Sequence, residues 1–360
     1  DAGVRTYVTA SDSLRAALGY CVQQVRQYDY LNYVWVAQMP KDLRPALFAL
    51  RAFNIETALV AENVRSRESV VGQIRFQWWR DAVKAAYDNR PPNHPVAVAL
   101  AHVLHSPQPG GAGSTGAAAT GTAAGGTGNG GSGTGRGAGG AADGSDAGSD
   151  YRADAGGAGG PGLHQGCMSA GSSGAGSGPG AVAARTGPGR FSRYSFKRII
   201  DCREADFLDP QPPLDLVALE LYAEGTASQL LYLQLAAAGI KDREADHAAS
   251  HLGRAAGITT LLRGTAAHAA ARRSYLPVDL CAEARVSQED VYGGVVSEGL
   301  RDVVHKVASL AKGHLDEARR LAPRLPPGAA ALMLPAVAIG RYLEALEGVN
   351  FDPYDARLLR

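Results

Sequence analysis

Two histidines on neighbouring turns of a predicted helix are the first candidates for chemistry in this 360-residue chain. His247 and His251 are four residues apart, a spacing that puts both imidazoles on one helix face and can chelate Zn²⁺. Asp246 is adjacent in sequence but points elsewhere, which leaves His268 as the candidate third ligand. The favoured alternative is that one histidine packs or hydrogen-bonds in the core while the other faces solvent. The sequence therefore predicts no resident metal.

The four cysteines offer no recognisable reactive site. Cys21, Cys167, Cys202 and Cys281 are widely scattered and form no C-x-x-C pair. Free thiols and a reducing compartment are the expected state. Because none of the four lies in an activating context, a nucleophilic Cys–His site is not predicted. No cofactor is predicted either.

Apolar residues recur at helical spacing in almost every periodic segment. The clearest case is 214–238, where residues such as Leu216, Leu219 and Leu230 follow steps of three and four, and Gly239 is placed to end the helix. No alternating run is long enough for a strand. The sequence therefore predicts an all-α fold. The other helices are expected at 12–30, 41–60, 68–88, 94–105, 243–263, 298–322 and 328–347.

A glycine-rich tract interrupts this helical pattern. Residues 107–189 hold 30 glycines among 83 positions and four large apolar side chains, too few to offset the backbone entropy of folding. The tract is expected to be disordered. A long insertion at a surface turn costs little, because closure entropy grows with the logarithm of loop length. Residues 1–106 and 190–360 are therefore predicted to form one domain around the insertion.

Charge and hydropathy exclude some partners. The net charge is +1 and the pI is about 7.9, so nucleic-acid binding has little support. No window approaches the roughly 18 uninterrupted apolar residues typical of a membrane span. The apolar segment 328–347 is expected to pack in the core, with docking on a membrane surface as the alternative. The protein is expected to be soluble or peripherally attached to a membrane.

Three stretches together resemble the squalene/phytoene synthases, a family of head-to-head prenyl synthases. They are PALFALRAFNIETALV at 45–60, WWRDAV…RPPNHPVAVAL at 78–100, and GRAAGITTLLRGTAAHAAARRSYLP at 253–277. The third is the most specific, with its Leu-Leu-Arg centre and Arg-x-Tyr-Leu-Pro end. The resemblance implies a single bundle of helices around a central cavity.

The same resemblance identifies a missing metal site. These synthases hold a substrate diphosphate through Mg²⁺ bridged to two Asp-x-x-x-Asp pairs, in which both carboxylates share a helix face. The first pair corresponds to Asn54 and Ala58, and the second to Gly264 and His268. None of the four is a carboxylate. The chain is therefore predicted not to be an enzyme, with an atypical prenyl transferase as the alternative.

The basic residues of the family's pocket are retained. Arg51, Arg263 and Arg273 match family arginines near the diphosphate, which implies a site for an anion, a lipid or a prenyl diphosphate. The alternative is that these arginines pair with local acids such as Glu56 or cap helix ends. A lipid-binding or prenyl-diphosphate-binding protein is thus a second candidate function.

Further phrases look like one branch of the family. They are DHAASHLGRAAGI at 246–258, LPVDLC and VSQEDV within 276–291, and VNFDPYD at 349–355. Members of that branch are catalytically silent and assist early assembly of the peripheral arm of mitochondrial respiratory complex I. The resemblance implies a location on the matrix side of the inner membrane. It also implies complex I subunits or other assembly factors as partners.

Overall fold

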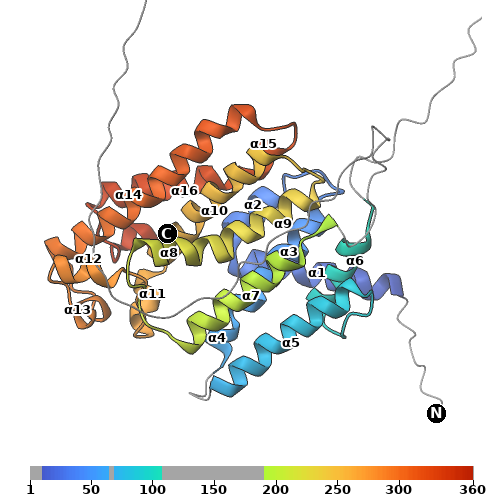
Figure 1. Ribbon diagram of the computed structural model, residues 1–360, viewed down its shortest axis with the longest axis horizontal. Coiled ribbons are helices and arrows are strands. Elements are labelled where there is room, and N and C mark those ends of the chain that lie inside the picture. The colour runs from blue at the N-terminus through green and yellow to red at the C-terminus, as the bar shows by residue number, and fades with distance from the viewer. Residues whose placement is uncertain (1–9, 65–68, 108–189, 360) are drawn as a thin grey trace, which may run out of the picture. The chain divides into compact units, whose positions relative to one another are not determined.

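The computed structural model describes residues 10–64, 69–107 and 190–359, which fold into helices and turns with no strand among them (Figure 1). The all-α prediction is confirmed. Described residues from both sides of the glycine-rich tract pack into one compact unit. Apart from Pro107, the tract predicted at 107–189 lies outside the described residues. The helices before it are α1 (Ala10–Tyr28), α2 (Tyr30–Val36), α3 (Arg44–Ala58), α4 (Val60–Asn63), α5 (Ser69–Tyr87) and α6 (Pro95–His105).

The second part of the chain supplies the remaining helices. Helix α7 and the short helices α11 to α13 were not predicted from the sequence. The helices are α7 (Arg193–Leu208), α8 (Leu216–Ala223), α9 (Gln229–Ala237), α10 (Arg243–Arg263), α11 (Thr265–Ala270), α12 (Val278–Glu283), α13 (Gln288–Tyr292), α14 (Glu298–Leu321), α15 (Ala329–Leu332) and α16 (Pro335–Gly348).

Helix α10 is the central element of this part. The side chain of Asp242 caps its first turn by accepting a hydrogen bond from the Ala245 amide at 2.8 Å. Its buried face is rich in small residues, and it packs against α8, α9, α14 and α16. At Gly253 an added Cβ would lie 2.3 Å from the Cα atom of Ser228. Glycine is therefore required for this close approach of two backbones.

The helix predicted at 214–238 contains a π-helical turn. Residues Glu224–Ser228 form this turn between α8 and α9. Thr226 donates a hydrogen bond to the Tyr222 carbonyl at 2.7 Å, and Ser228 donates one to the Ser250 carbonyl at 3.0 Å. The turn thereby faces α10. After α9, Gly239 has a φ of 76°, which confirms it as the glycine that ends this helix.

Aromatic rings join the N-terminal helices to α7. Phe53 of α3 makes edge-to-face contacts with Trp79 of α5 and Phe196 of α7, with ring centroids 5.6 and 5.2 Å apart. Trp79 is buried, while the adjacent Trp78 is 38% exposed. Helix α3 is thus held in the core with one edge against α7.

The apolar segment near the C-terminus is divided. Helices α15 and α16 meet at Met333 and Leu334, and Pro335 begins the second helix. By length and composition alone, Ala329–Gly348 is long and apolar enough to cross a membrane, which the sequence reading did not expect. Inside the fold, 44% of its most apolar window is buried.

Candidate functional site

A guanidinium lies against the position at which the family resemblance places its first carboxylate. Arg203 of α7 donates a hydrogen bond from Nη2 to Oδ1 of Asn54 at 2.7 Å. Its Nη1 donates to the Asn54 carbonyl and to the Thr57 hydroxyl. All three acceptors are neutral oxygens of α3. Burial lowers the pKa of Arg203 from its ordinary value, but guanidinium remains charged in proteins.

One turn further along α7, a carboxylate binds a second arginine. Asp206 accepts a hydrogen bond from Arg273 at 2.8 Å and another from the Tyr275 hydroxyl at 2.7 Å. Burial alone would lower the pKa of Arg273, but Asp206 and Tyr275 together raise it. Asp206 is thus occupied by groups of the chain itself.

Two further side chains close this cluster. The His268 ring packs edge-on against Tyr275, with centroids 4.8 Å apart. Burial and the nearby Arg273 lower the pKa of His268, which favours a neutral imidazole. Burial raises the pKa of Tyr222 to about 12. We refer to Asn54, Thr57, Arg203, Asp206, Tyr222, His268, Arg273 and Tyr275 as the Asp206 cluster.

A small apolar pocket lies beside this cluster. Tyr275 lines it, together with Leu219, Ile258 and Val307. The cavity volume is about 10 Å³, close to the space that one water molecule needs. An isoprenoid chain would therefore fit only if the surrounding helices moved apart.

The other motif positions are dispersed around the cluster. Ala58 is exposed at the end of α3. Gly264 follows the last residue of α10, and an added Cβ there would lie 2.6 Å from Cε1 of His268. Neither residue offers an oxygen side chain for a metal. None of the four positions can supply the carboxylates that Mg²⁺ prefers.

The three arginines predicted for anion binding have no common partner among the described residues. Arg51 is buried, pairs with Asp29 at 3.1 Å and lies over the Trp35 ring. Arg273 pairs with Asp206, and Arg263 is exposed at the end of α10. Glu56, the expected local acid, instead accepts a hydrogen bond from Tyr20 at 2.6 Å. Local pairing thus uses acids other than the one the sequence suggested.

The two histidines of α10 are adjacent, as their spacing predicted. Nε2 of His251 lies 3.2 Å from Nε2 of His247. His251 is half-buried and His247 is exposed. The suggested third ligand is wrong, because His268 packs on Tyr275 in the Asp206 cluster. Glu317 of α14 is the nearby group instead.

Sequence reasoning missed the residues that α7 contributes. Arg203 and Asp206 lie on a helix in which charged residues are almost as frequent as apolar ones. The usable signal was the spacing of Phe196, Ile199 and Ile200, together with Ser192, which caps the helix.

The family is decided by a match over most of the chain. Residues 25–110 and 181–360 match the squalene/phytoene synthase family. The chain belongs to the squalene/phytoene synthase family. The interval 111–180, which falls within the glycine-rich tract, is outside the match.

Within this synthase family, the most informative relatives share one name. The chain is 31% identical to "NADH dehydrogenase (ubiquinone) complex I, assembly factor 6" of Bos taurus, over 95% of this chain and 77% of that protein. The Homo sapiens protein of the same name is 30% identical, over 94% and 76%. A homologue in Dictyostelium discoideum is 24% identical, over 94% and 72%.

Solved structures of the family show the same fold. The squalene synthase HpnC from Alicyclobacillus acidocaldarius superimposes with a TM-score of 0.63 and 15% identity, over 95% of this chain and 97% of that one. A dehydrosqualene synthase in complex with ligand also gives 0.63, with 14% identity over 95% and 90%. At these identities the likeness concerns the fold alone.

Proposed function

We propose that this chain is a non-catalytic factor that assists early assembly of mitochondrial respiratory complex I. The observation that carries the proposal is similarity over almost the whole chain to proteins named complex I assembly factor 6. The similarity includes both halves of the synthase-like bundle. It therefore supports a role for the bundle itself.

The Asp206 cluster supports the absence of synthase chemistry. Family synthases use Mg²⁺ to stabilise a departing diphosphate, and Mg²⁺ requires hard anionic oxygens. Here Asn54 is bound to Arg203, and Asp206 is bound to Arg273. A guanidinium on Asn54 and a metal ion at the same place would repel each other. The charges of the cluster thus serve to hold α3, α7 and the segment after α11 together.

Location and partners follow from the same proposal. An assembly factor for complex I acts in mitochondria, and we place this chain on the matrix side of the inner membrane. Its partners are complex I subunits of the peripheral arm or other assembly factors. Membrane association is peripheral, and helix α16 is held in the bundle by the buried side chains of Ile339, Leu343 and Leu346.

We further propose that the glycine-rich tract interrupts a single domain. Residue Arg190 donates a hydrogen bond to the Val103 carbonyl at 3.0 Å, and Tyr87 donates one to the Phe191 carbonyl at 3.1 Å. The two ends of the tract are therefore fixed near each other. Residues 1–106 and 190–360 form the domain in this proposal, and 107–189 is the insertion.

The test is rescue of complex I in cells that lack this chain. We expect selective loss of complex I on native gels and of NADH:ubiquinone activity, restored by the wild-type chain. The variant His268→Ala should restore both equally, because His268 has no catalytic task. Normal complex I in the deficient cells would contradict the assembly role. Failure of His268→Ala to rescue, with the variant present at the wild-type level, would contradict catalytic silence.

A further inference from the structure

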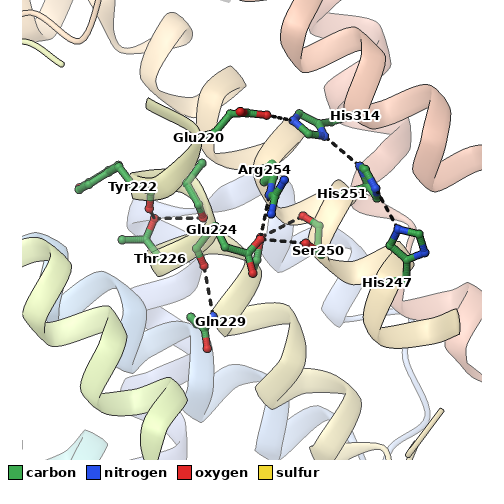
Figure 2. Close-up of polar contacts among 12 residues, drawn as sticks. Glu220, Tyr222, Glu224, Thr226, Gln229, His247, Ser250, His251, Arg254 and His314 are labelled. Atoms are coloured by element: carbon green, nitrogen blue, oxygen red, sulfur yellow. Dashed lines mark hydrogen bonds and ion pairs between the residues drawn. The ribbon is translucent and has the colours of Figure 1, made fainter. Parts of the chain in front are cut away.

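Three histidines and the carboxylate of Glu220 lie in a row across α8, α10 and α14 (Figure 2). His314 of α14 is bound through Nε2 to the carboxylate of Glu220 on α8. Its Nδ1 lies 2.9 Å from Nδ1 of His251, whose Nε2 lies 3.2 Å from Nε2 of His247. Glu317, one turn after His314, lies beside the two α10 histidines. The row is separate from the Asp206 cluster and has no part in the proposed function.

The end of the row at His247 and His251 has the dimensions of a metal site. Zn²⁺ binds imidazole nitrogen at about 2.0–2.1 Å, so two nitrogens of a tetrahedral site lie about 3.3 Å apart. The Nε2 atoms of His247 and His251 are 3.2 Å apart. One ring nitrogen of each histidine and a carboxylate oxygen of Glu317 all lie within 4.8 Å of one another. A small rotation of the Glu317 side chain would complete three ligands.

Proton placement along the row favours a lone pair at the metal position. With Glu220 ionised, His314 donates from Nε2 and, when neutral, has an acceptor at Nδ1. His251 then donates from Nδ1 to His314 and keeps its Nε2 lone pair directed toward His247. Metal-binding histidines commonly donate their other N–H to such a partner.

The surrounding charges allow a cation here. Arg320 donates to both carboxylate oxygens of Glu317, from Nε at 2.8 Å and from Nη2 at 2.5 Å. Arg320 is 56% exposed, and each carboxylate oxygen has a second lone pair for a metal. Arg254, three residues after His251 on α10, is already paired with Glu224 at 3.0 Å. Exposure of His247 leaves a fourth coordination position open to water or to a ligand of a partner.

We propose that His247, His251 and Glu317 form a binding site for Zn²⁺ or a similar divalent transition metal. His314 and Glu220 are its positioning residues, since they fix the ring orientation and tautomer of His251. The bound metal ties α10 to α14 and offers one open coordination position at the surface. Three protein ligands with one open position are also the arrangement of catalytic zinc sites, so water or a partner side chain can complete the site.

The test is Zn²⁺ binding to the purified full chain after removal of metal with a chelator. Calorimetry should give one Zn²⁺ per chain, and Zn²⁺ should raise the melting temperature. The variants His247→Ala and Glu317→Gln should each weaken the affinity at least about tenfold, and Glu220→Gln about tenfold with the stoichiometry kept. His102→Ala, which removes another exposed histidine, should change nothing.

Cobalt provides a second readout that does not depend on stability. Co²⁺ at this site should show the visible absorption of a nitrogen and oxygen ligand set and no sulfur-to-cobalt charge-transfer band. His247 is exposed, so His247→Ala keeps the fold, which circular dichroism checks. Absence of Zn²⁺ binding by the full chain, affinity unchanged in His247→Ala, or a thiolate band from a cysteine would each overturn the proposal.

Discussion

Arg203 and Asn54 join two helices that are far apart in sequence, through a 2.7 Å hydrogen bond between Nη2 and Oδ1. The bond places an internal cation where the family resemblance puts a metal-binding carboxylate. Because Arg203 also donates to the Asn54 carbonyl and to Thr57, it satisfies three oxygens of α3 at once. The contacts of Arg203 thus join α3 to α7 at the place where related synthases are expected to bind a metal.

Replacement of Arg203 should destabilise the fold. Arg203→Met keeps the length of the side chain but removes a charged donor from three partly buried oxygens of Asn54 and Thr57. Of these, the Asn54 carbonyl keeps a hydrogen bond from the Thr57 hydroxyl at 3.1 Å. We expect the free energy of unfolding to fall by about 2–3 kcal/mol. Urea unfolding followed by circular dichroism measures it. Arg263→Met is the matched control, since Arg263 is exposed, and should change stability by less than about 0.5 kcal/mol.

Magnesium should have no specific effect on the chain. Farnesyl or geranylgeranyl diphosphate with Mg²⁺ should yield no condensation product, because the four motif positions supply no carboxylate. A ligand that binds the folded state raises its melting temperature, so millimolar Mg²⁺ with diphosphate should leave it unchanged. Product analysis tests the first expectation, and thermal unfolding tests the second. A Mg²⁺-dependent product would show that the chain is a working synthase.

Local patterns predicted most of the long helices but not α7, while the side-chain clusters required the tertiary structure. Helix α10 was predicted with its observed bounds, because its small and apolar residues repeat at helical spacing. The pair Asp206–Arg273 joins residues 67 apart in sequence, and His314–Glu220 joins residues 94 apart. The spacing of apolar residues along the chain indicates where a helix forms, but it does not indicate which residues of different helices come into contact. For that reason the third neighbour of His247 and His251 was sought at His268 rather than on α14.

Stability should depend on pH through Glu224 of the π-helical turn (Figure 2). Burial opposes its charge, but hydrogen bonds from Tyr232, Ser250 and Arg254 lower its pKa on balance. Its ordinary pKa when unfolded is about 4.3. The stabilisation is therefore complete above that pH and is lost as pH falls through the lower, folded value.

The variant Glu224→Gln isolates this contribution. At neutral pH it should lower the free energy of unfolding by about 1–2 kcal/mol, reduced by solvent screening of the half-buried Arg254. Between about pH 5 and pH 3 the wild type should lose stability more steeply than the variant. Urea unfolding across this range measures both slopes. Parallel slopes would mean that Glu224 has the same pKa in both states.

Deletion of residues 110–186 should leave the domain intact. The contacts of Arg190 with Val103 and of Tyr87 with Phe191 fix the ends of the tract near each other, so six remaining residues can connect them. A shorter loop loses less entropy when its ends are brought together. Shortening the tract from 83 to six residues halves its length nearly four times, which should lower the free energy of closure by up to about 2 kcal/mol. The melting temperature should therefore stay the same or rise. A marked decrease would show that the tract contributes packing to the domain.

Substitution by alanine should have opposite effects on stability at a glycine of α10 and at a glycine of α14. Gly253→Ala would place a Cβ 2.3 Å from both Cα and Oγ of Ser228 and 2.6 Å from its amide nitrogen. Backbone atoms cannot give way without moving the π-helical turn, so we expect a loss of about 2–4 kcal/mol. At Gly313 an added Cβ meets nothing within 4 Å, and Gly313→Ala should stabilise the helix by about 0.5–1 kcal/mol. Urea unfolding of both variants gives the comparison. A mild effect of Gly253→Ala, equal to that of Gly313→Ala, would show that α10 and the turn can separate at little cost.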